Sequence, residues 1–157
     1  MNEALINGGV DAISIWEPFG YMLNQDAGGK VVNIGSPGVY QLSFNLISST
    51  SVLHSLPPAT SERTIEALAK AIDWINQYPA QAQAVISNSL DIPVEQLRWS
   101  WDDYVFRLSL GNALLTNLQL QARWALENDI RRGTMPSYRD IVSRESFDKL
   151  LSSGRLK

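Results

Sequence analysis

The chain has 157 residues, of which 45% are hydrophobic and 18% charged, and its formal net charge is −3. This balance lacks the basic excess that is typical of nucleic-acid-binding proteins. The sequence contains no cysteine, which excludes disulfides, cysteine-ligated zinc and a thiol nucleophile. No stretch reaches the roughly 20 apolar residues of a membrane-spanning helix, and the first residues lack the pattern of a signal peptide.

The first 47 residues predict short strands separated by glycine-containing turns. A helix is expected to end over residues 3–7, and a second helix is expected over residues 18–24. Runs of β-branched and aromatic residues, bounded by glycine and proline, predict the strands. These strands are expected at residues 10–16, 30–34 and 39–47.

The third of these strands has the clearest alternation. Its apolar side chains, Leu42, Phe44 and Leu46, fall on one face, and its polar side chains fall on the other. The residues that follow, 48–60, are low in charge and rich in serine and proline. They are therefore expected to form a connector or hinge.

From residue 61 the sequence has helical periodicity. Thr60 or Ser61 can cap a first helix, which Tyr78 and Pro79 interrupt. Pro79 is expected to open a second helix that runs to about residue 90.

The remaining elements are also mainly helical. Asp91 is expected to cap a short helix, and residues 104–110 alternate well enough to predict a strand. The longest helix is expected at residues 112–128, followed by a short piece at 138–142 and a terminal helix at 146–151.

A Trp-Glu-Pro-Phe corner at residues 16–19 follows the first predicted strand. Proline disfavours a helical residue before it but suits the first turn of a helix, so the chain should turn sharply here. Ligands of open α/β sheets usually bind at the carboxyl ends of strands. Trp16 either faces a ligand or packs in the core, and Glu17 either contacts a ligand amine or accepts backbone N–H groups of the next helix. Tyr40, at the start of the third strand, is a weaker candidate.

Sequence patterns for catalysis and metal binding are absent. The single histidine, His54, is expected in a loop, without a nucleophile motif nearby. Asp102 and Asp103 are adjacent, so a solvated pair is favoured over an acid–base pair. Arg131 and Arg132 are expected to complement the end of the long helix. We therefore expect no catalytic residue, metal or cofactor.

Residues 9–12 (Gly-Val-Asp-Ala) and 16–19 (Trp-Glu-Pro-Phe) resemble the second lobe of the solute-binding proteins of bacterial ABC importers, of the nitrate, sulfonate and taurine type. Residues 30–38 look like the next strand and turn of that family, residues 41–51 like its crossover strand, and residues 64–82 like its helix pair. With the later strand and long helix at 104–124, the resemblance extends over nearly the whole chain.

The resemblance implies a helix-rich α/β fold with a partial sheet, taken from a two-lobed, periplasmic-binding-protein-like clamp of type II whose first lobe is largely missing. It divides the chain into residues 1–47, part of the second lobe, residues 48–60, the connector, and residues 61–157, a helical portion that returns to the first lobe. The chain would then be a truncated, C-terminal portion of such a protein. An unpaired sheet edge would favour a homodimer.

The resemblance also implies a function without catalysis. The protein would hold a small anion or sulfonate-like molecule for a membrane permease, with Trp16, Glu17 and Tyr40 as ligand-binding residues. Its parent would be periplasmic, or extracellular and lipid-anchored. Two alternatives stay open, namely an enzyme of the related thiamine-pyrimidine synthesis type and a helical sensor or interaction module.

Overall fold

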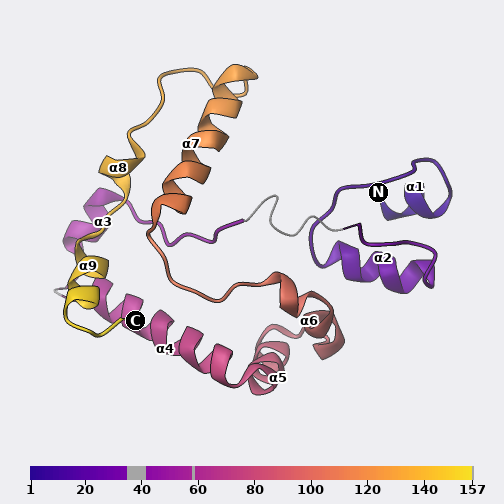
Figure 1. The fold of residues 1–157 in the computed structure, drawn as a ribbon, viewed down its shortest axis with the longest axis horizontal. Helices are drawn as coiled ribbons and strands as arrows, with labels where there is room; N and C mark the ends of the chain where they lie inside the picture. Colours follow the sequence, from indigo (N-terminus) through magenta and orange to yellow (C-terminus); the bar gives the residue numbers. More distant parts are fainter. Residues whose placement is uncertain (35–41, 58, 157) are drawn as a thin grey trace. The chain divides into compact units, whose positions relative to one another are not determined.

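The computed structural model describes residues 1–34, 42–57 and 59–156, and in this part of the chain every regular element is a helix (Figure 1). In chain order these are α1 (Asn2–Ile6), α2 (Phe19–Ala27), α3 (Thr50–Ser55), α4 (Thr60–Gln77), α5 (Pro79–Leu90), α6 (Val94–Ser100), the 3-10 helix η1 (Trp101–Asp103), α7 (Asn112–Glu127), α8 (Tyr138–Ile141) and α9 (Glu145–Ser152).

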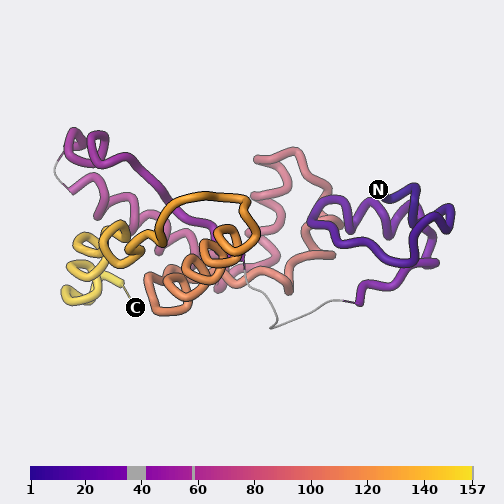
Figure 2. The backbone as a smooth tube through the Cα atoms, turned by 90° about the horizontal axis from the view of Figure 1, so that it is seen from above, coloured from indigo at the N-terminus to yellow at the C-terminus, as the bar shows by residue number. Residues whose placement is uncertain are grey.

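The chain divides into two compact units. The first comprises Met1–Gln41 and Ile75–Phe106, and the second comprises Leu42–Trp74 and Arg107–Lys157. Within the first unit α1 lies against α2, α2 against α6 and α6 against α5 (Figure 2). Within the second unit α7 contacts α8. The division at residues 47 and 60 that follows from the resemblance stays a prediction.

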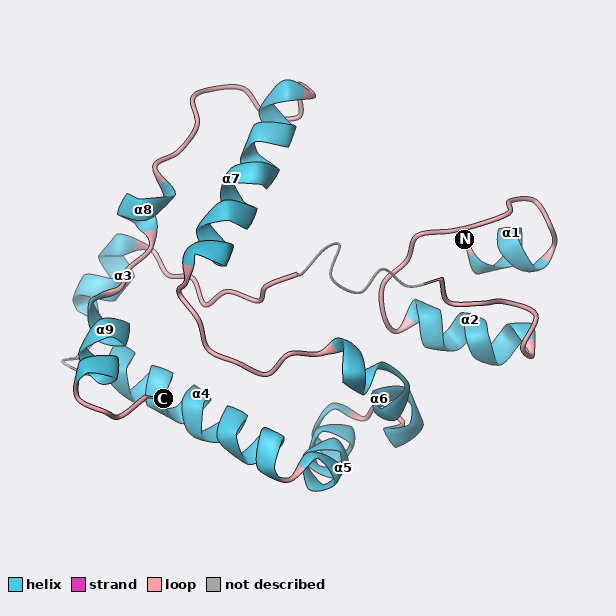
Figure 3. Cartoon of the chain, in the orientation of Figure 1, coloured by secondary structure: helices cyan, strands magenta, loops and turns pink. Residues whose placement is uncertain are grey.

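The predicted α/β fold is wrong for the described residues, because none of them belongs to a β-strand (Figure 3). Residues 10–16, 30–34, 42–47 and 104–110 are non-helical, as predicted, but they pair with no neighbouring strand. Alternation of apolar and polar side chains only makes a segment suitable for a sheet. A strand also needs a second backbone aligned beside it to complete the hydrogen-bonded ladder.

The helix boundary around Pro79 is confirmed. α4 ends at Gln77 and α5 begins at Pro79, where the missing proline N–H and the fixed φ suit the first helical position. Other details differ from the prediction. The longest helix is α4, with 18 residues against 16 in α7. The predicted connector contains α3, whose first turn is capped by a bond from the Val52 N–H to Ser49 Oγ (3.3 Å).

Helices α1, α7 and α9 end in the same type of turn, in which a residue with positive φ reverses the chain. After α9, Gly154 has φ 70°, its N–H donates to Leu151 O (3.1 Å) and the Arg155 N–H donates to Leu150 O (3.0 Å). These two bonds are those of a Schellman motif. Gly8 holds the corresponding place after α1, whereas Asp129, with φ 55°, holds it after α7.

Asp91 also has positive φ, 54°, and it ends α5. The prediction that Asp91 caps the start of the next helix is therefore wrong, and Pro93 precedes α6 instead. Aspartate tolerates the left-handed region better than most residues, which explains how it can replace glycine at such a turn.

Few apolar side chains of the described residues are buried. In the first unit these are Leu23, Ala27, Ala82 and Leu97, and in the second unit Leu150 and Leu156. Leu150 and Leu156 come together because the turn at Gly154 folds the chain back, so that the Leu156 N–H donates to Leu150 O (3.3 Å). Each unit thus has a small apolar centre.

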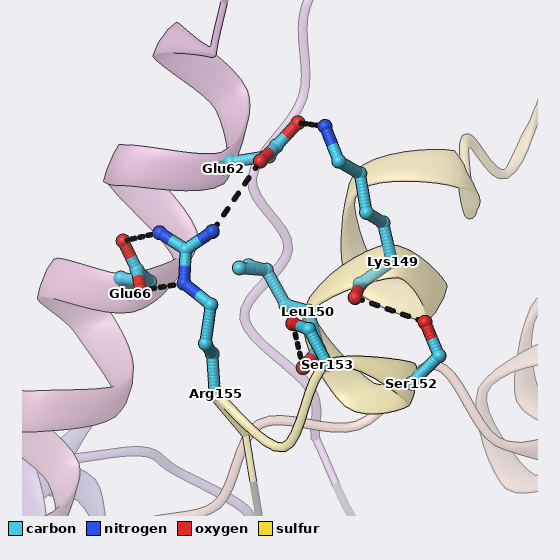
Figure 4. A network of polar contacts seen from close by, with 7 residues as sticks. All are labelled: Glu62, Glu66, Lys149, Leu150, Ser152, Ser153 and Arg155. Atoms are coloured by element: carbon cyan, nitrogen blue, oxygen red, sulfur yellow. Dashed lines mark hydrogen bonds and ion pairs between the residues drawn. The ribbon is translucent and has the colours of Figure 1, made fainter.

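An ion network joins α4 to α9 and the turn after it, in the second unit (Figure 4). Lys149 Nζ lies 2.6 Å from Glu62 Oε1, and Arg155 Nη2 lies 2.6 Å from Glu66 Oε2. The bond from Arg155 lowers the pKa of the Glu66 carboxyl. These charged side chains are long enough to connect two helices whose backbones do not pack closely.

Candidate functional site

Trp16 projects from the corner between the non-helical segment 10–16 and α2. Its side chain is 72% exposed, and its ring meets the Phe19 ring edge to face, with the ring centres 5.9 Å apart and the planes at 82°. A core position for Trp16, one of the two alternatives from the sequence, is therefore wrong. A large exposed aromatic surface is costly to keep in water, and it is available for contact with another molecule.

Glu17 is held in place by both of its carboxylate oxygens. Oε2 accepts a hydrogen bond from the Tyr21 N–H (3.1 Å), and Oε1 accepts one from the Trp99 indole N–H (3.1 Å). The Tyr21 N–H belongs to the first turn of α2, whose N–H groups lack partners within the helix. The expected role of Glu17 as an acceptor at a helix start is confirmed, and its bond to Trp99 also links α2 to α6.

Gly20 provides the space in which the Glu17 carboxylate lies. A Cβ atom at this position would be 2.7 Å from Glu17 Oε1, which is closer than such contacts allow. The Tyr21 and Trp99 rings meet beside it, with their centres 6.5 Å apart. The corner is thus positioned by contacts with α6, and Trp16 stands at its outer side.

An open hollow of about 410 Å³ lies next to Trp16. The residues around it come from α1 and the corner, and they are Met1, Asn2, Glu3, Ile15, Trp16 and Phe19. Asn2 Nδ2 donates to Phe19 O (3.3 Å), which ties the two sides of the hollow together. Glu3 is the only ionisable side chain among these lining residues.

The other sequence candidates lie elsewhere or have a different setting. Tyr40 lies outside the described residues. His54 is in the last turn of α3, so the prediction of a loop position is wrong. Asp102 and Asp103 are both exposed, as predicted for a solvated pair. The described residues contain no group of three or more side chains that could hold a metal ion.

The prediction for Arg131 and Arg132 is wrong as well. α7 ends at Glu127, and no basic residue lies in its last turn. The turn at Asp129 ends this helix before the two arginines are reached.

Trp99 is the residue of the corner that sequence reasoning missed. It lies 82 positions after Glu17 in the sequence. No spacing or motif relates the two positions, because their contact depends on how α6 lies against α2. Only the three-dimensional structure could identify the pair.

No protein-family model matches this chain, and neither the curated proteins nor the solved structures include a match. Within the described residues, no helix is both long and apolar enough to cross a membrane.

Proposed function

We propose that the chain is the solute-binding component of an ABC-type importer, a non-catalytic protein that holds a small molecule for a membrane permease. In this proposal the protein acts outside the cytoplasmic membrane, in the periplasm or attached by a lipid. The proposal depends on the Trp-Glu-Pro corner and does not require a β-sheet.

The geometry of Trp16 is the observation that supports ligand binding. Its indole is 72% exposed beside an apolar hollow of about 410 Å³, which is within the size range of small-molecule sites. Glu17, fixed by two hydrogen bonds, keeps the corner in one conformation. A preorganised aromatic face loses little conformational entropy when a ligand covers it.

The lining of the hollow favours organic solutes over bare inorganic anions. Its lining is mainly apolar, with Met1, Ile15, Trp16 and Phe19 beside only two polar side chains, Asn2 and Glu3. An anion must be compensated by hydrogen bonds or positive charge when it leaves water. We therefore propose that the alkyl or ring part of a sulfonate or pyrimidine covers Trp16, while its polar group stays towards solvent.

Titration calorimetry tests this function with taurine, a longer alkanesulfonate, a pyrimidine and nitrate. We expect heat with at least one organic ligand, and binding roughly tenfold weaker in Trp16→Ala, which corresponds to ~1.4 kcal/mol. Trp124→Ala, an exposed tryptophan of the second unit, is the matched control and should bind like the unaltered chain. Absence of heat with all three organic ligands would refute the proposal, as would equal effects of the two substitutions.

A helical interaction module is the second candidate, and the helical character of the described residues favours it. Leu120 and Trp124, one turn apart on α7, are both exposed and could contact a partner. Two chains with a single tryptophan, at position 16 or 124, would separate the candidates. Small ligands should change the fluorescence of Trp16 under the first, whereas protein association should change that of Trp124 under the second.

A further inference from the structure

Residues 42–46 expose an apolar face and backbone N–H groups without a partner in the described part of the chain. Leu42, Phe44 and Leu46 are 63%, 85% and 75% exposed. Within the described part of the chain, the backbone N–H groups of residues 42–48 donate no hydrogen bond. A segment in this state leaves both its side chains and its backbone polar groups to be satisfied by another surface or by water.

The sequence Leu-Ser-Phe-Asn-Leu of this segment is symmetric in polarity about Phe44. If two copies pair antiparallel with Phe44 opposite Phe44 of the other copy, then Leu42 falls opposite Leu46. All the apolar side chains then share one face, and Ser43 falls opposite Asn45 on the other face. Cross-strand pairs of this kind stabilise a sheet. The segment is therefore complementary to itself.

Charge does not oppose such a pairing. The sequence has no aspartate, glutamate, lysine or arginine between Lys30 and Glu62, and no proline between Pro37 and Pro57. Charged residues and prolines are the usual means by which proteins prevent strand pairing at exposed edges. By comparison, the other alternating segment, residues 104–110, carries Arg107 at its centre.

We infer that residues 42–46 form an antiparallel, two-fold symmetric strand pair with the same residues of a second copy, centred on Phe44. This pair is the core of a homodimer interface. It pairs the backbone groups that point towards the other copy and brings the apolar side chains of both copies together on one face. The inference does not depend on the proposed ligand, since the corner lies in the other unit.

Single cysteines test this register directly, because the chain has none of its own. Directly opposed residues of an antiparallel pair have Cα atoms about 4.5–5.5 Å apart, within the range of a disulfide. Phe44→Cys should therefore form a covalent dimer under mild oxidation. In Leu42→Cys the two cysteines would be four residues apart along the strands, or about 14 Å, and should not react. A mixture of Leu42→Cys and Leu46→Cys should give a mixed disulfide.

Val105→Cys, at another exposed apolar position, is the matched control and should remain uncrosslinked. Equal crosslinking of Val105→Cys and Phe44→Cys, or of Leu42→Cys and Phe44→Cys, would overturn the inference. A monomeric mass of the unaltered chain by light scattering, up to high micromolar concentration, would do so as well. A disulfide between Phe44→Cys and another protein, in place of a second copy of this chain, would also contradict the inference.

Charge reversal provides a second test that separates loss of pairing from loss of folding. Phe44→Lys and Phe44→Glu each place like charges opposite one another, so each variant should be monomeric while keeping the helical circular dichroism of the parent. Mixing the two should restore a dimer of twice 17.5 kDa, because the charges then attract. A mixture that stays monomeric would contradict the inferred register.

Discussion

Replacing Glu17 with alanine tests the contacts that hold the corner. The substitution removes the acceptor for the Tyr21 N–H at the start of α2 and the acceptor for the Trp99 indole N–H. Loss of a side-chain acceptor at a helix start costs about 1 kcal/mol. Loss of the second hydrogen bond costs about 1 kcal/mol more. The free energy of unfolding of the first unit should therefore fall by about 2 kcal/mol.

Urea unfolding, followed by tryptophan fluorescence and circular dichroism, measures this change. A loss of about 2 kcal/mol should lower the urea midpoint by roughly 1 M. Asp26→Ala removes an exposed carboxylate from the same helix and is the matched control. Its effect should stay within about 0.5 kcal/mol.

A double-mutant cycle with Trp99→Phe isolates the hydrogen bond between the two side chains. Each single variant loses this bond, so the double variant should be more stable than the sum of the single effects predicts, by about 0.5–1.5 kcal/mol. The reasoning would be refuted if Glu17→Ala behaved like Asp26→Ala. It would also be refuted if the effects of the two corner substitutions were additive.

Three predictions concern the second unit. Leu150→Ala should lower the free energy of unfolding by about 2–5 kcal/mol, because this leucine is fully buried. Gly154→Ala should cost about 1 kcal/mol, since Gly154 has φ 70°, whereas Asp129→Gly, at φ 55°, should leave stability equal or improve it. The third is a pH dependence. Arg155 lowers the folded-state pKa of Glu66. The stability that this ion pair contributes is therefore present above the ordinary glutamate pKa of 4.5, and it is lost as the pH falls through the lowered value. Arg155→Ala should therefore show a weaker loss of stability over this acid range than the parent.

Thermal or urea unfolding at fixed pH measures the first two effects. Leu151→Ala, at an exposed neighbour, is the control for Leu150→Ala and should cost less than about 1 kcal/mol. The pH prediction requires unfolding curves from neutral to acid pH for Arg155→Ala and for Arg98→Ala, whose ion pair with Glu95 joins two exposed side chains. Identical acid profiles of Arg155→Ala and the parent would contradict the assigned role of Arg155.

Local backbone chemistry explains which helix ends were predictable. Pro79 cannot donate a backbone hydrogen bond and clashes with a preceding turn, so a break at that position follows from the residue itself. Gly8 closes α1 for a similarly local reason, since glycine adopts positive φ without steric cost. Asp91 and Asp129 hold the same conformation, but aspartate also favours helix starts, so the sequence left their roles ambiguous.

At the corner, too, one contact could be predicted from the local sequence and another could not. The bond from the Tyr21 N–H to Glu17 spans four residues and was expected from the Glu-Pro start of a helix. The bond from Trp99 to the same carboxylate depends on the packing of α6 against α2. Sequence spacing carries no information about that packing.

The sequence by itself determined the absence of cysteine chemistry, the uncharged stretch from 31 to 61 and most helix positions, because composition and backbone propensity are properties of each residue and its neighbours. Tertiary structure decided that the alternating segments of the described chain stay unpaired, that Trp16 faces outward and that Glu17 meets Trp99. Pairing and burial depend on which distant surfaces come together, and the free energy of those contacts is set by the whole chain.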